Sequence, residues 1–204
     1  MVALTFDDGP HYTVTPRILD ILQKNNARAT FFVLGNRVDN FPNIIQREYS
    51  QGHEIGSHSF SHPQITTLTS EEIEYQFTET EHRIQQYVPY TTKLIRPPYG
   101  QITQSLKEVL QKTFVLWSID TQDWKTRDKD AIVSEVLNNV KDGDIILMHD
   151  MYSTTADACE ELIPALIERG YQLVTVSELL NAKEITPVAG SVYSRVLSTG
   201  NAAS

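Results

Sequence analysis

The sequence predicts an α/β protein whose parallel sheet closes, or nearly closes, into a (β/α) barrel. Short apolar, β-prone segments recur along the chain, at residues 2–6, 29–33, 54–57, 93–95, 114–119, 144–149 and 172–174. Segments with helical periodicity lie between most of them, at residues 16–23, 44–49, 70–88, 102–110, 131–140 and 156–168. Strands that alternate with helices at intervals of roughly 20–40 residues indicate βαβ units, and about seven such units favour a barrel over an open sheet.

Residues that commonly begin or end helices support these assignments. Pro16 suits a first helical turn, where its missing amide is not needed. Thr69 places a hydroxyl just ahead of a serine and two glutamates, which is the pattern of a helix start, and Gly170 ends the helix at 156–168. Cys159 lies on the apolar side of that last helix, so we expect a small buried core residue. As the only cysteine, it excludes an intrachain disulfide.

Length and composition predict one globular domain with a terminal extension. The chain has 204 residues, of which 40% are hydrophobic and 21% charged, and its net charge is −9. We expect one globular domain at residues 1–182 and a C-terminal extension at 183–204, with one short strand at 191–196 and a disordered end. Met1 runs directly into the first predicted strand, so the protein is either cytoplasmic or a piece from which upstream sequence has been removed.

The patterns of charged and apolar residues exclude a nucleic-acid partner and a membrane-spanning helix. The sequence holds no cluster of Lys and Arg of the kind that binds phosphates, which excludes nucleic-acid binding led by backbone contacts. It also holds no apolar run near the roughly 18 residues that a membrane-spanning helix needs. We therefore expect neither a nucleic-acid partner nor a membrane-spanning segment, and we expect a monomer.

Reactive residues follow the predicted strands. Sites in parallel α/β folds form at the carboxyl ends of the strands. Asp-Asp-Gly-Pro follows the first strand at 7–10, and two histidines lie near the end of the third. Arg-Pro-Pro-Tyr-Gly follows the fourth at 96–100, Asp-Thr-Gln-Asp-Trp the fifth at 120–124, and His-Asp the sixth at 149–150. These segments are the candidates for a functional site.

His58 and His62 are candidate metal ligands. Two imidazoles four residues apart lie on one face of a helical turn and can share one ion, although the bare spacing also arises by chance on surface turns. A zinc-type catalytic site takes three protein ligands, so the third would be a carboxylate. His53 is too far from His58 for the His-Glu-x-x-His pattern and is predicted to be structural, and His82 is predicted to lie on the surface.

Adjacent carboxylates, a histidine and an arginine complete the candidate site. Asp7 and Asp8 would point to opposite sides of an extended chain, so one could bind a metal while the other acts as a general base. His149 leaves a buried strand and is suited to proton transfer, with Asp123 as the carboxylate that orients it. Arg96 precedes two prolines that stiffen its loop, and could pair with an aspartate. Each feature alone also has an ordinary structural explanation.

Taken together and in order, these segments resemble the motifs of the polysaccharide deacetylase (NodB-homology) domain, carbohydrate esterase family 4. The motifs are Thr-Phe-Asp-Asp-Gly-Pro at 5–10, His-Ser-Phe-Ser-His at 58–62, Arg-Pro-Pro-Tyr-Gly at 96–100, Asp-Thr-Gln-Asp-Trp at 120–124 and Leu-Met-His at 147–149. All five are intact, and the general resemblance extends to about residue 180. It implies a distorted (β/α)7-type barrel and a metal-dependent hydrolase that needs no serine or cysteine nucleophile.

The resemblance also implies roles for individual residues. Asp8, His58 and His62 would bind one divalent ion, usually zinc and sometimes cobalt or another ion. Asp7 would be the general base, held by Arg96, and His149 the general acid, oriented by Asp123. Trp124 and Leu147 would line the acetyl pocket, and the backbone N–H of Tyr99 would help to hold the oxyanion.

The implied substrate is an N-acetylated polysaccharide. The amino-acid sequence in and around the motifs, at residues 27–35 and 147–150, is similar to that of Gram-positive peptidoglycan N-acetylglucosamine deacetylases. This resemblance implies a secreted or surface-tethered, extracytoplasmic enzyme. Alternatives with the same machinery are a chitooligosaccharide deacetylase and an acetylxylan O-esterase. More remote alternatives are an amidohydrolase of a small cyclic amide and an inactive carbohydrate-binding module, which loss of Asp7, His149 or a metal ligand would have indicated.

Overall fold

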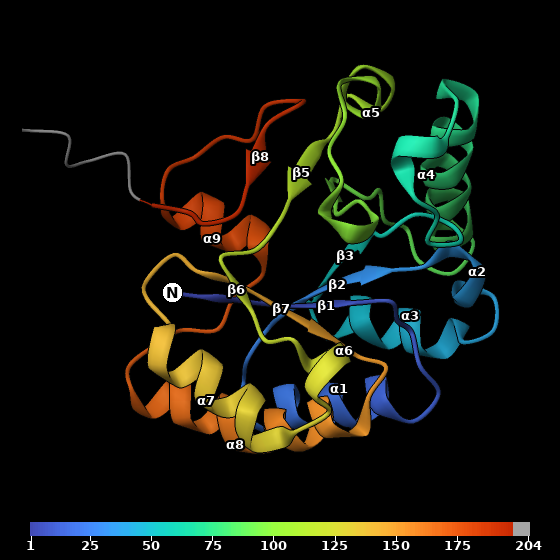
Figure 1. The fold of residues 1–204 in the computed structure, drawn as a ribbon. Coiled ribbons are helices and arrows are strands. Elements are labelled where there is room, and N and C mark those ends of the chain that lie inside the picture. The colour runs from blue at the N-terminus through green and yellow to red at the C-terminus, as the bar shows by residue number, and fades with distance from the viewer. Residues whose placement is uncertain (198–204) are drawn as a thin grey trace, which may run out of the picture.

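The structure, a computed structural model, describes residues 1–197 and forms an α/β fold around one curled parallel sheet (Figure 1). Its strands are β1 Ala3–Asp7, β2 Thr30–Val33, β3 Glu54–Ser57, β4 Leu94–Ile95, β5 Thr113–Val115, β6 Ile119–Asp120, β7 Ile145–His149 and β8 Val192–Tyr193. Within the described residues the order across the sheet is β6-β7-β1-β2-β3-β4-β5-β8, with every pairing parallel. The predicted α/β barrel class is therefore confirmed, as a half-barrel with β6 and β8 at its edges.

Helices cover the outside of the curled sheet. They are α1 Val14–Lys24, α2 Gly35–Val38, α3 Pro42–Ser50, α4 Ser70–Gln85, α5 Gln104–Leu110, α6 Asp123–Thr126, α7 Lys129–Asn139, α8 Ser153–Glu168 and α9 Val176–Ala182, with 3-10 turns at Ile65–Thr67 and Pro98–Gly100. Helices α1, α7 and α8 lie together below the sheet in Figure 1, and α4 and α5 lie together at its other end. The central strands are buried along their whole length, as parallel strands covered by helices are.

The predicted helix ends agree with the structure. Thr69 caps α4 with a full capping box, in which its hydroxyl accepts the amide of Glu72 and the Glu72 carboxylate accepts the amide of Thr69. Gly170 follows α8 with φ +84°, a left-handed conformation that glycine adopts without strain. Cys159 on α8 is fully buried in the core, as predicted.

The segment at 114–119, predicted as one strand, forms two strands that lie near opposite ends of the strand order. β5 pairs with β4 and β8, whereas β6 pairs with β7. The intervening residues cross between them, because the amide of Leu116 donates to Tyr193 O and the amide of Ser118 donates to Ile145 O. A single apolar run gives no sign of this change of partner. The crossing brings the two ends of the curled sheet toward each other.

The predicted strand at 172–174 is also wrong. The structure has only an isolated bridge there, between Leu173 and Val2, with hydrogen bonds at 3.0 and 3.1 Å to the backbone of Val2. Three short helices were not predicted, namely α2, α6 and α9. The first two contain four residues each, which is too short for a helical period to be visible.

Residues 183–197 pack onto the sheet. β8 lies within the predicted strand at 191–196 and pairs with β5. Arg195 forms an ion pair with the buried Asp144, and Val196 is fully buried in the same cluster as Val115 and Leu180. The domain boundary at 182 stays a prediction, and the predicted disordered end falls on residues 198–204, which lie outside the described residues.

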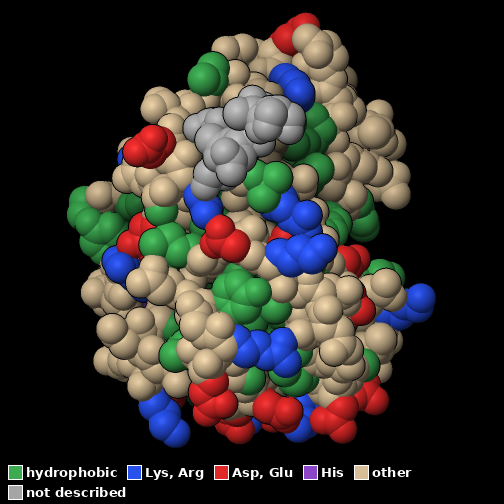
Figure 2. Space-filling view, turned by 90° about the vertical axis from the view of Figure 1, so that its left-hand side faces the viewer, with side chains coloured by type: hydrophobic (Ala, Val, Ile, Leu, Met, Phe, Trp, Pro, Cys, Tyr) green, Lys and Arg blue, Asp and Glu red, His purple; other side chains and the backbone are tan. Residues whose placement is uncertain are grey.

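The surface of the molecule is mixed in charge on the face that carries α9 and β8. Figure 2 shows basic side chains in several separate places on this face, with acidic side chains among them. Among residues 1–197, no helix combines the length and the apolar character needed to cross a membrane.

Candidate active site

The candidate residues meet at the carboxyl ends of the central strands. Asp7 is the last residue of β1 and His149 the last residue of β7. His58 directly follows β3, and Arg96 directly follows β4. Because these strands lie in one parallel sheet, Asp7, His58 and His149 line one cavity although they are widely separated in the sequence. Arg96 is fully buried and contacts Asp7.

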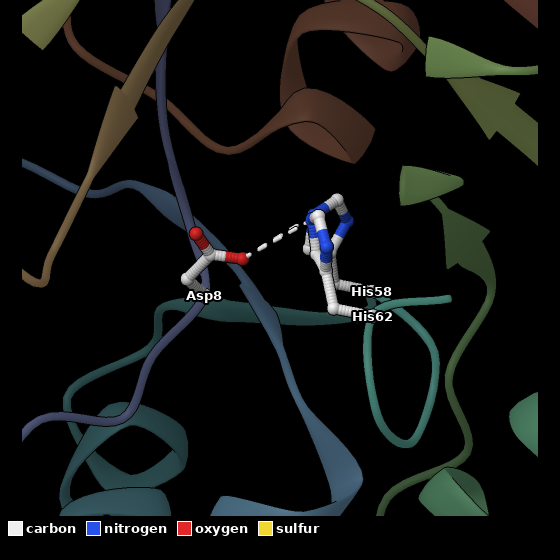
Figure 3. Close-up of side chains that lie close together, drawn as sticks. All are labelled: Asp8, His58 and His62. Atoms are coloured by element: carbon white, nitrogen blue, oxygen red, sulfur yellow. Dashed lines mark ion pairs between the residues drawn. The ribbon is translucent and has the colours of Figure 1, made fainter. Parts of the chain in front are cut away.

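Asp8, His58 and His62 form a compact donor set. Asp8 Oδ1 lies 3.6 Å from Nε2 of His58 and 3.6 Å from Nε2 of His62. One ligand atom from each residue lies within 4.8 Å of the other two. Figure 3 shows the aspartate, from the loop after β1, pointing at the two imidazoles from the loop after β3. The predicted metal ligands are thus brought together.

The surroundings leave these three ligand atoms available to a cation. Nδ1 of His58 donates to Arg96 O at 2.7 Å, because a carbonyl can only accept, and this directs the Nε2 lone pair toward Asp8. Asp8 Oδ1 is buried and has no hydrogen-bond partner, which is costly for a carboxylate unless a cation faces it. Burial, and then the neighbouring His58, lower the pKa of His62, so its ring is neutral and able to coordinate at neutral pH.

The two histidines lie on a bent loop, so the predicted helical turn is wrong. Ser59 and His62 have positive φ values of 76° and 60°. The loop is held from outside, because Gln76 Oε1 on α4 accepts the amides of Phe60 and Ser61 at 2.9 Å each, and Ser59 Oγ accepts the amide of His62. The loop folds back far enough to bring both rings to the same point, with centroids 5.0 Å apart.

Asp7 is held by a buried arginine. Arg96 Nη1 donates to Asp7 Oδ1 at 2.8 Å, and both side chains are almost completely buried. Three further guanidinium N–H groups donate to Val115 O, Leu116 O and the Thr5 hydroxyl, so the ion pair is fixed by additional hydrogen bonds. Asp7 Oδ2 lies 3.7 Å from His58 Nε2.

Both adjacent aspartates therefore approach the same imidazole, and the expectation that they point to opposite sides is wrong. Asp8 has left the extended conformation, with φ 73°. The alternation of side chains applies only where the backbone stays extended. The positive φ turns Asp8 back toward His58.

His149 is paired with Asp123. Its Nδ1–H donates to Asp123 Oδ1 at 2.7 Å, and its backbone amide donates to Asp123 Oδ2 at 2.7 Å. Asp123 Oδ2 also accepts the Thr155 hydroxyl, which fixes this fully buried carboxylate. Burial alone would lower the pKa of His149, but the hydrogen bond to Asp123 and the negative charges of Asp123, Asp7 and Asp8 together raise it to about 9.

A cavity of about 400 Å³ joins these groups. It is lined by Asp7, Asp8, His58, His62, Tyr99, Gly100, Trp117, Asp120, Trp124, Leu147, His149 and Tyr152. At its mouth, Tyr99 is 59% exposed and Trp124 is 50% exposed, while Leu147 is buried in its wall. Tyr99 adopts a left-handed conformation with φ 57° inside the 3-10 turn at 98–100.

Four residues that line the cavity were not singled out from the sequence, and one of them, Gly100, belongs to the motif at 96–100. Asp120 lies in a segment chosen for other members, and Tyr152 follows His149 closely, so proximity in sequence was the available signal. Trp117 gave no signal, because it sits in the segment that was taken for a continuous strand. Conversely, His53 is buried and accepts the amide of Ala29, and His82 is exposed, as predicted.

Comparison with known proteins agrees with this arrangement. A family model described as polysaccharide deacetylase matches residues 1–115. The chain is 46% identical over 184 residues to the peptidoglycan-N-acetylmuramic acid deacetylase PdaC of Bacillus subtilis, covering 90% of this chain and 39% of that protein. It is 40% identical over 190 residues to a peptidoglycan-N-acetylglucosamine deacetylase of Bacillus cereus, covering 90% of this chain and 69% of that protein.

A solved structure shows the same fold. The family 4 acetyl xylan esterase of Clostridium thermocellum, in complex with a cobalt ion, is 37% identical and superposes with a TM-score of 0.91 over 96% of this chain and 98% of that one. Some longer relatives, PdaC among them, are covered over only 39% of their length. The match of the family model over more than half of the chain, together with these relatives, shows that the chain belongs to the polysaccharide deacetylase family, carbohydrate esterase family 4.

Proposed function

We propose that this chain is a metal-dependent deacetylase that hydrolyses N-acetyl groups of N-acetylglucosamine residues in a cell-wall polysaccharide, with peptidoglycan as the substrate. The observation that carries the proposal is the meeting of three units in one cavity. These are the Asp8–His58–His62 donor set, the Asp7–Arg96 ion pair and the Asp123–His149 pair. Loss of Asp7, His149 or a metal ligand would indicate an inactive binding module, and all of these residues are present.

The donor set fits a divalent ion with nitrogen and oxygen ligands. Two neutral imidazoles and one carboxylate are a set that zinc accepts, with a position left for substrate. We propose zinc as the resident ion, with cobalt as a competent substitute, as the cobalt complex of the related esterase supports. When bound at Asp8, His58 and His62, such an ion supplies Lewis-acid polarisation of the scissile carbonyl.

Asp7 is the proposed general base. Its Oδ2 faces the donor set at 3.7 Å from His58 Nε2, while its Oδ1 is engaged by Arg96. The carboxylate is therefore fixed in place with one oxygen left to accept the proton of the attacking water. Arg96 acts as a positioning residue, because its guanidinium touches Asp7 and backbone carbonyls and is fully buried.

His149 is the proposed general acid. Its raised pKa of about 9 keeps the ring protonated near neutral pH, and Asp123 fixes the proton on Nδ1 so that Nε2–H is the one available for donation. An amine leaves poorly unless it is protonated. Donation to the departing nitrogen completes amide hydrolysis, which leaves acetate and a glucosamine unit.

The cavity walls suit an acetyl group beside a sugar. Leu147 supplies an apolar wall for the methyl group, and Trp124 and Tyr99 present exposed rings at the mouth where a sugar face can stack. The backbone N–H of Tyr99 is the proposed oxyanion donor, and such donors are often worth about 3 kcal/mol in the transition state.

The identity of the acetylated sugar is the finer part of the proposal. The Bacillus cereus relative, named for N-acetylglucosamine, supports glucosamine units, whereas PdaC, named for N-acetylmuramic acid, favours the neighbouring sugar of the same polymer. An acetylxylan ester is a second candidate, favoured by the structural similarity to the esterase. A cell-wall substrate places the protein outside the cytoplasm, and we propose that it acts there as a monomer.

The decisive experiment measures acetate released from purified peptidoglycan by the zinc-loaded protein, with a chelated sample beside it. We expect release that disappears on chelation and returns when zinc is added back. Digestion of the product with a muramidase and mass analysis of the fragments then assigns the deacetylated sugar. Deacetylated muramic acid would replace the glucosamine assignment. A zinc-bound protein that is inactive on peptidoglycan but active on acetylxylan would move the substrate to an ester.

A further inference from the structure

Asp150 is a buried carboxylate next to the site that the proposed chemistry does not use. It directly follows His149 and is 1% exposed. Its Oδ2 accepts the hydroxyl of Thr15 at 2.5 Å, which ties the end of β7 to the first turn of α1. Its Oδ1 is buried without a hydrogen-bond partner, so placing this carboxyl group here costs free energy of folding.

The Asp150 carboxylate lies flat against Gly9. A Cβ atom built on Gly9 would collide with all three atoms of that carboxylate. Gly9 does not have a positive φ, so the position needs glycine for space and not for backbone freedom. Gly9 is bonded to the metal ligand Asp8, and its carbonyl accepts the amide of Leu34 at 2.9 Å on the other side. The residue after Asp8 is therefore held between Asp150 and the end of β2.

Thr15 makes a second contact with the same loop. Its Oγ1 accepts the backbone amide of His11 at 2.8 Å while its hydroxyl hydrogen goes to Asp150. The Thr15–Asp150 pair thus holds the loop after β1 at two points, Gly9 and His11. These two contacts are important because Asp8 departs from extended geometry with φ 73°, a conformation that persists only when its surroundings impose it.

We propose that Asp150, anchored by Thr15, is a positioning residue that holds Gly9 and thereby aims Asp8 at His58 and His62. The same residue joins the strand that carries His149 to the loop that carries Asp7 and Asp8, so one contact sets the spacing between the acid and the metal ligands. The inference rests on the proposed function in that it concerns the same site, but its main readout is metal binding, which needs no substrate.

The test compares two disruptive variants with their conservative counterparts. Asp150→Ala and Thr15→Val remove the contact from either side, whereas Asp150→Asn and Thr15→Ser keep an acceptor and a hydroxyl in place. Thr30→Val removes another buried hydroxyl, which donates to the Glu54 carboxylate and accepts the amide of Val176 at the start of β2, away from the site, and serves as the matched control. Cobalt(II) is the probe. Its visible absorption spectrum reports ligand geometry, and competition with a chelating dye gives the affinity.

We expect Asp150→Ala and Thr15→Val to bind cobalt about tenfold more weakly and with an altered spectrum, in line with the loss of groups that orient metal ligands. The conservative variants and Thr30→Val should stay within about twofold of wild type. On substrate, kcat should fall while KM changes little, because the sugar-contacting walls are untouched.

Wild-type cobalt affinity and spectrum in folded Asp150→Ala and Thr15→Val would overturn the inference, as would equal losses in Thr30→Val. If Asp150→Ala does not fold, Thr15→Val decides alone, because it is nearly isosteric. Failure of the proposed function looks different. In that case the wild-type protein binds cobalt with the expected spectrum but releases no acetate from any acetylated glycan.

Discussion

Asp7 and His149 are register partners on the adjacent parallel strands β1 and β7. Neighbouring strands lie about 4.8 Å apart, and partners in register point to the same face of the sheet. The proposed base and the proposed acid therefore leave the sheet side by side at the carboxyl ends of their strands. Their separation is set by strand pairing, while their orientation is fixed by different partners, Arg96 for Asp7 and Asp123 for His149.

The two adjacent aspartates should respond differently to mutation. Asp8→Ala removes one of three ligands, so zinc affinity should fall by at least about 100-fold. Asp7→Asn keeps the shape of the side chain and leaves the ligands in place, so zinc should stay bound while kcat falls by about 10²–10⁴-fold. Zinc content by equilibrium dialysis and acetate release check the two effects separately. Equal metal loss in both variants would contradict the division of roles.

The alkaline limit of activity should follow the protonation of His149. The acid must carry its proton, so kcat is lost as the pH rises through the pKa of about 9. In Asp123→Asn the negative charge is lost while burial remains, so the pKa falls and the alkaline limb should move down by about one unit or more.

The measurement is kcat between pH 6 and pH 11 for both proteins. Asp130→Asn is the control, because it removes an acidic side chain that is exposed to solvent, whereas Asp123 is buried. A limb that stays in place in Asp123→Asn would show that His149 is not the group that titrates.

The parts of the site that could be predicted from sequence are those that depend on order along the chain. Asp7, Arg96 and His149 were found because polar residues stand where buried strands end, a pattern that a parallel sheet turns into proximity. The bent conformations were not predictable. Asp8, Ser59, His62 and Tyr99 have positive φ without being glycine, and a pattern of polar and apolar residues carries no signal for such conformations at single positions. Gln76, which holds the loop of His58, lies on α4 and shows no sign of this role in its own sequence context.

The same reasoning explains the errors in the fold. The segment at 114–119 is apolar except for Ser118, and its change of partner at Leu116 depends on β8 and β7, which come much later in the chain. The helix ends at Thr69 and Gly170 were predictable because their signals are local. Strand partners are not a local property, so the pairing of β8 with β5 could not be predicted from the composition of the C-terminal segment.

The C-terminal segment should contribute to stability through Val196. This side chain is fully buried in a cluster with Ala3, Val115 and Leu180. Val196→Ala should lower the free energy of unfolding by about 2 kcal/mol, from the lost methyl burial and the cavity left behind. Val188→Ala, at a position that is 64% exposed, should change it by less than about 0.5 kcal/mol. Urea unfolding measures both, and equal effects would mean that residues 183–197 do not share the core.

His53 should make the fold sensitive to acid. Burial first, and then the charges of Arg47 and Arg28, lower its pKa from 6.5 to about 4. A group whose pKa is depressed on folding contributes stability above its unfolded pKa and loses it as the pH falls through the folded value. The contribution is therefore complete above pH 6.5 and is lost toward pH 4, with a full size of about 3 kcal/mol.

His53→Asn isolates this effect, because the amide oxygen can replace Nδ1 as the acceptor of the Ala29 amide but does not titrate. We expect the variant to be less stable than wild type at pH 7.5, since the smaller side chain leaves a cavity. The difference should shrink at pH 4.5, because in wild type the unfolded chain binds a proton at His53 that the folded protein binds only weakly, whereas the asparagine of the variant binds none. Urea unfolding at the two pH values measures it, and a difference that stays constant would show that His53 is protonated as easily in the folded protein as in the unfolded chain.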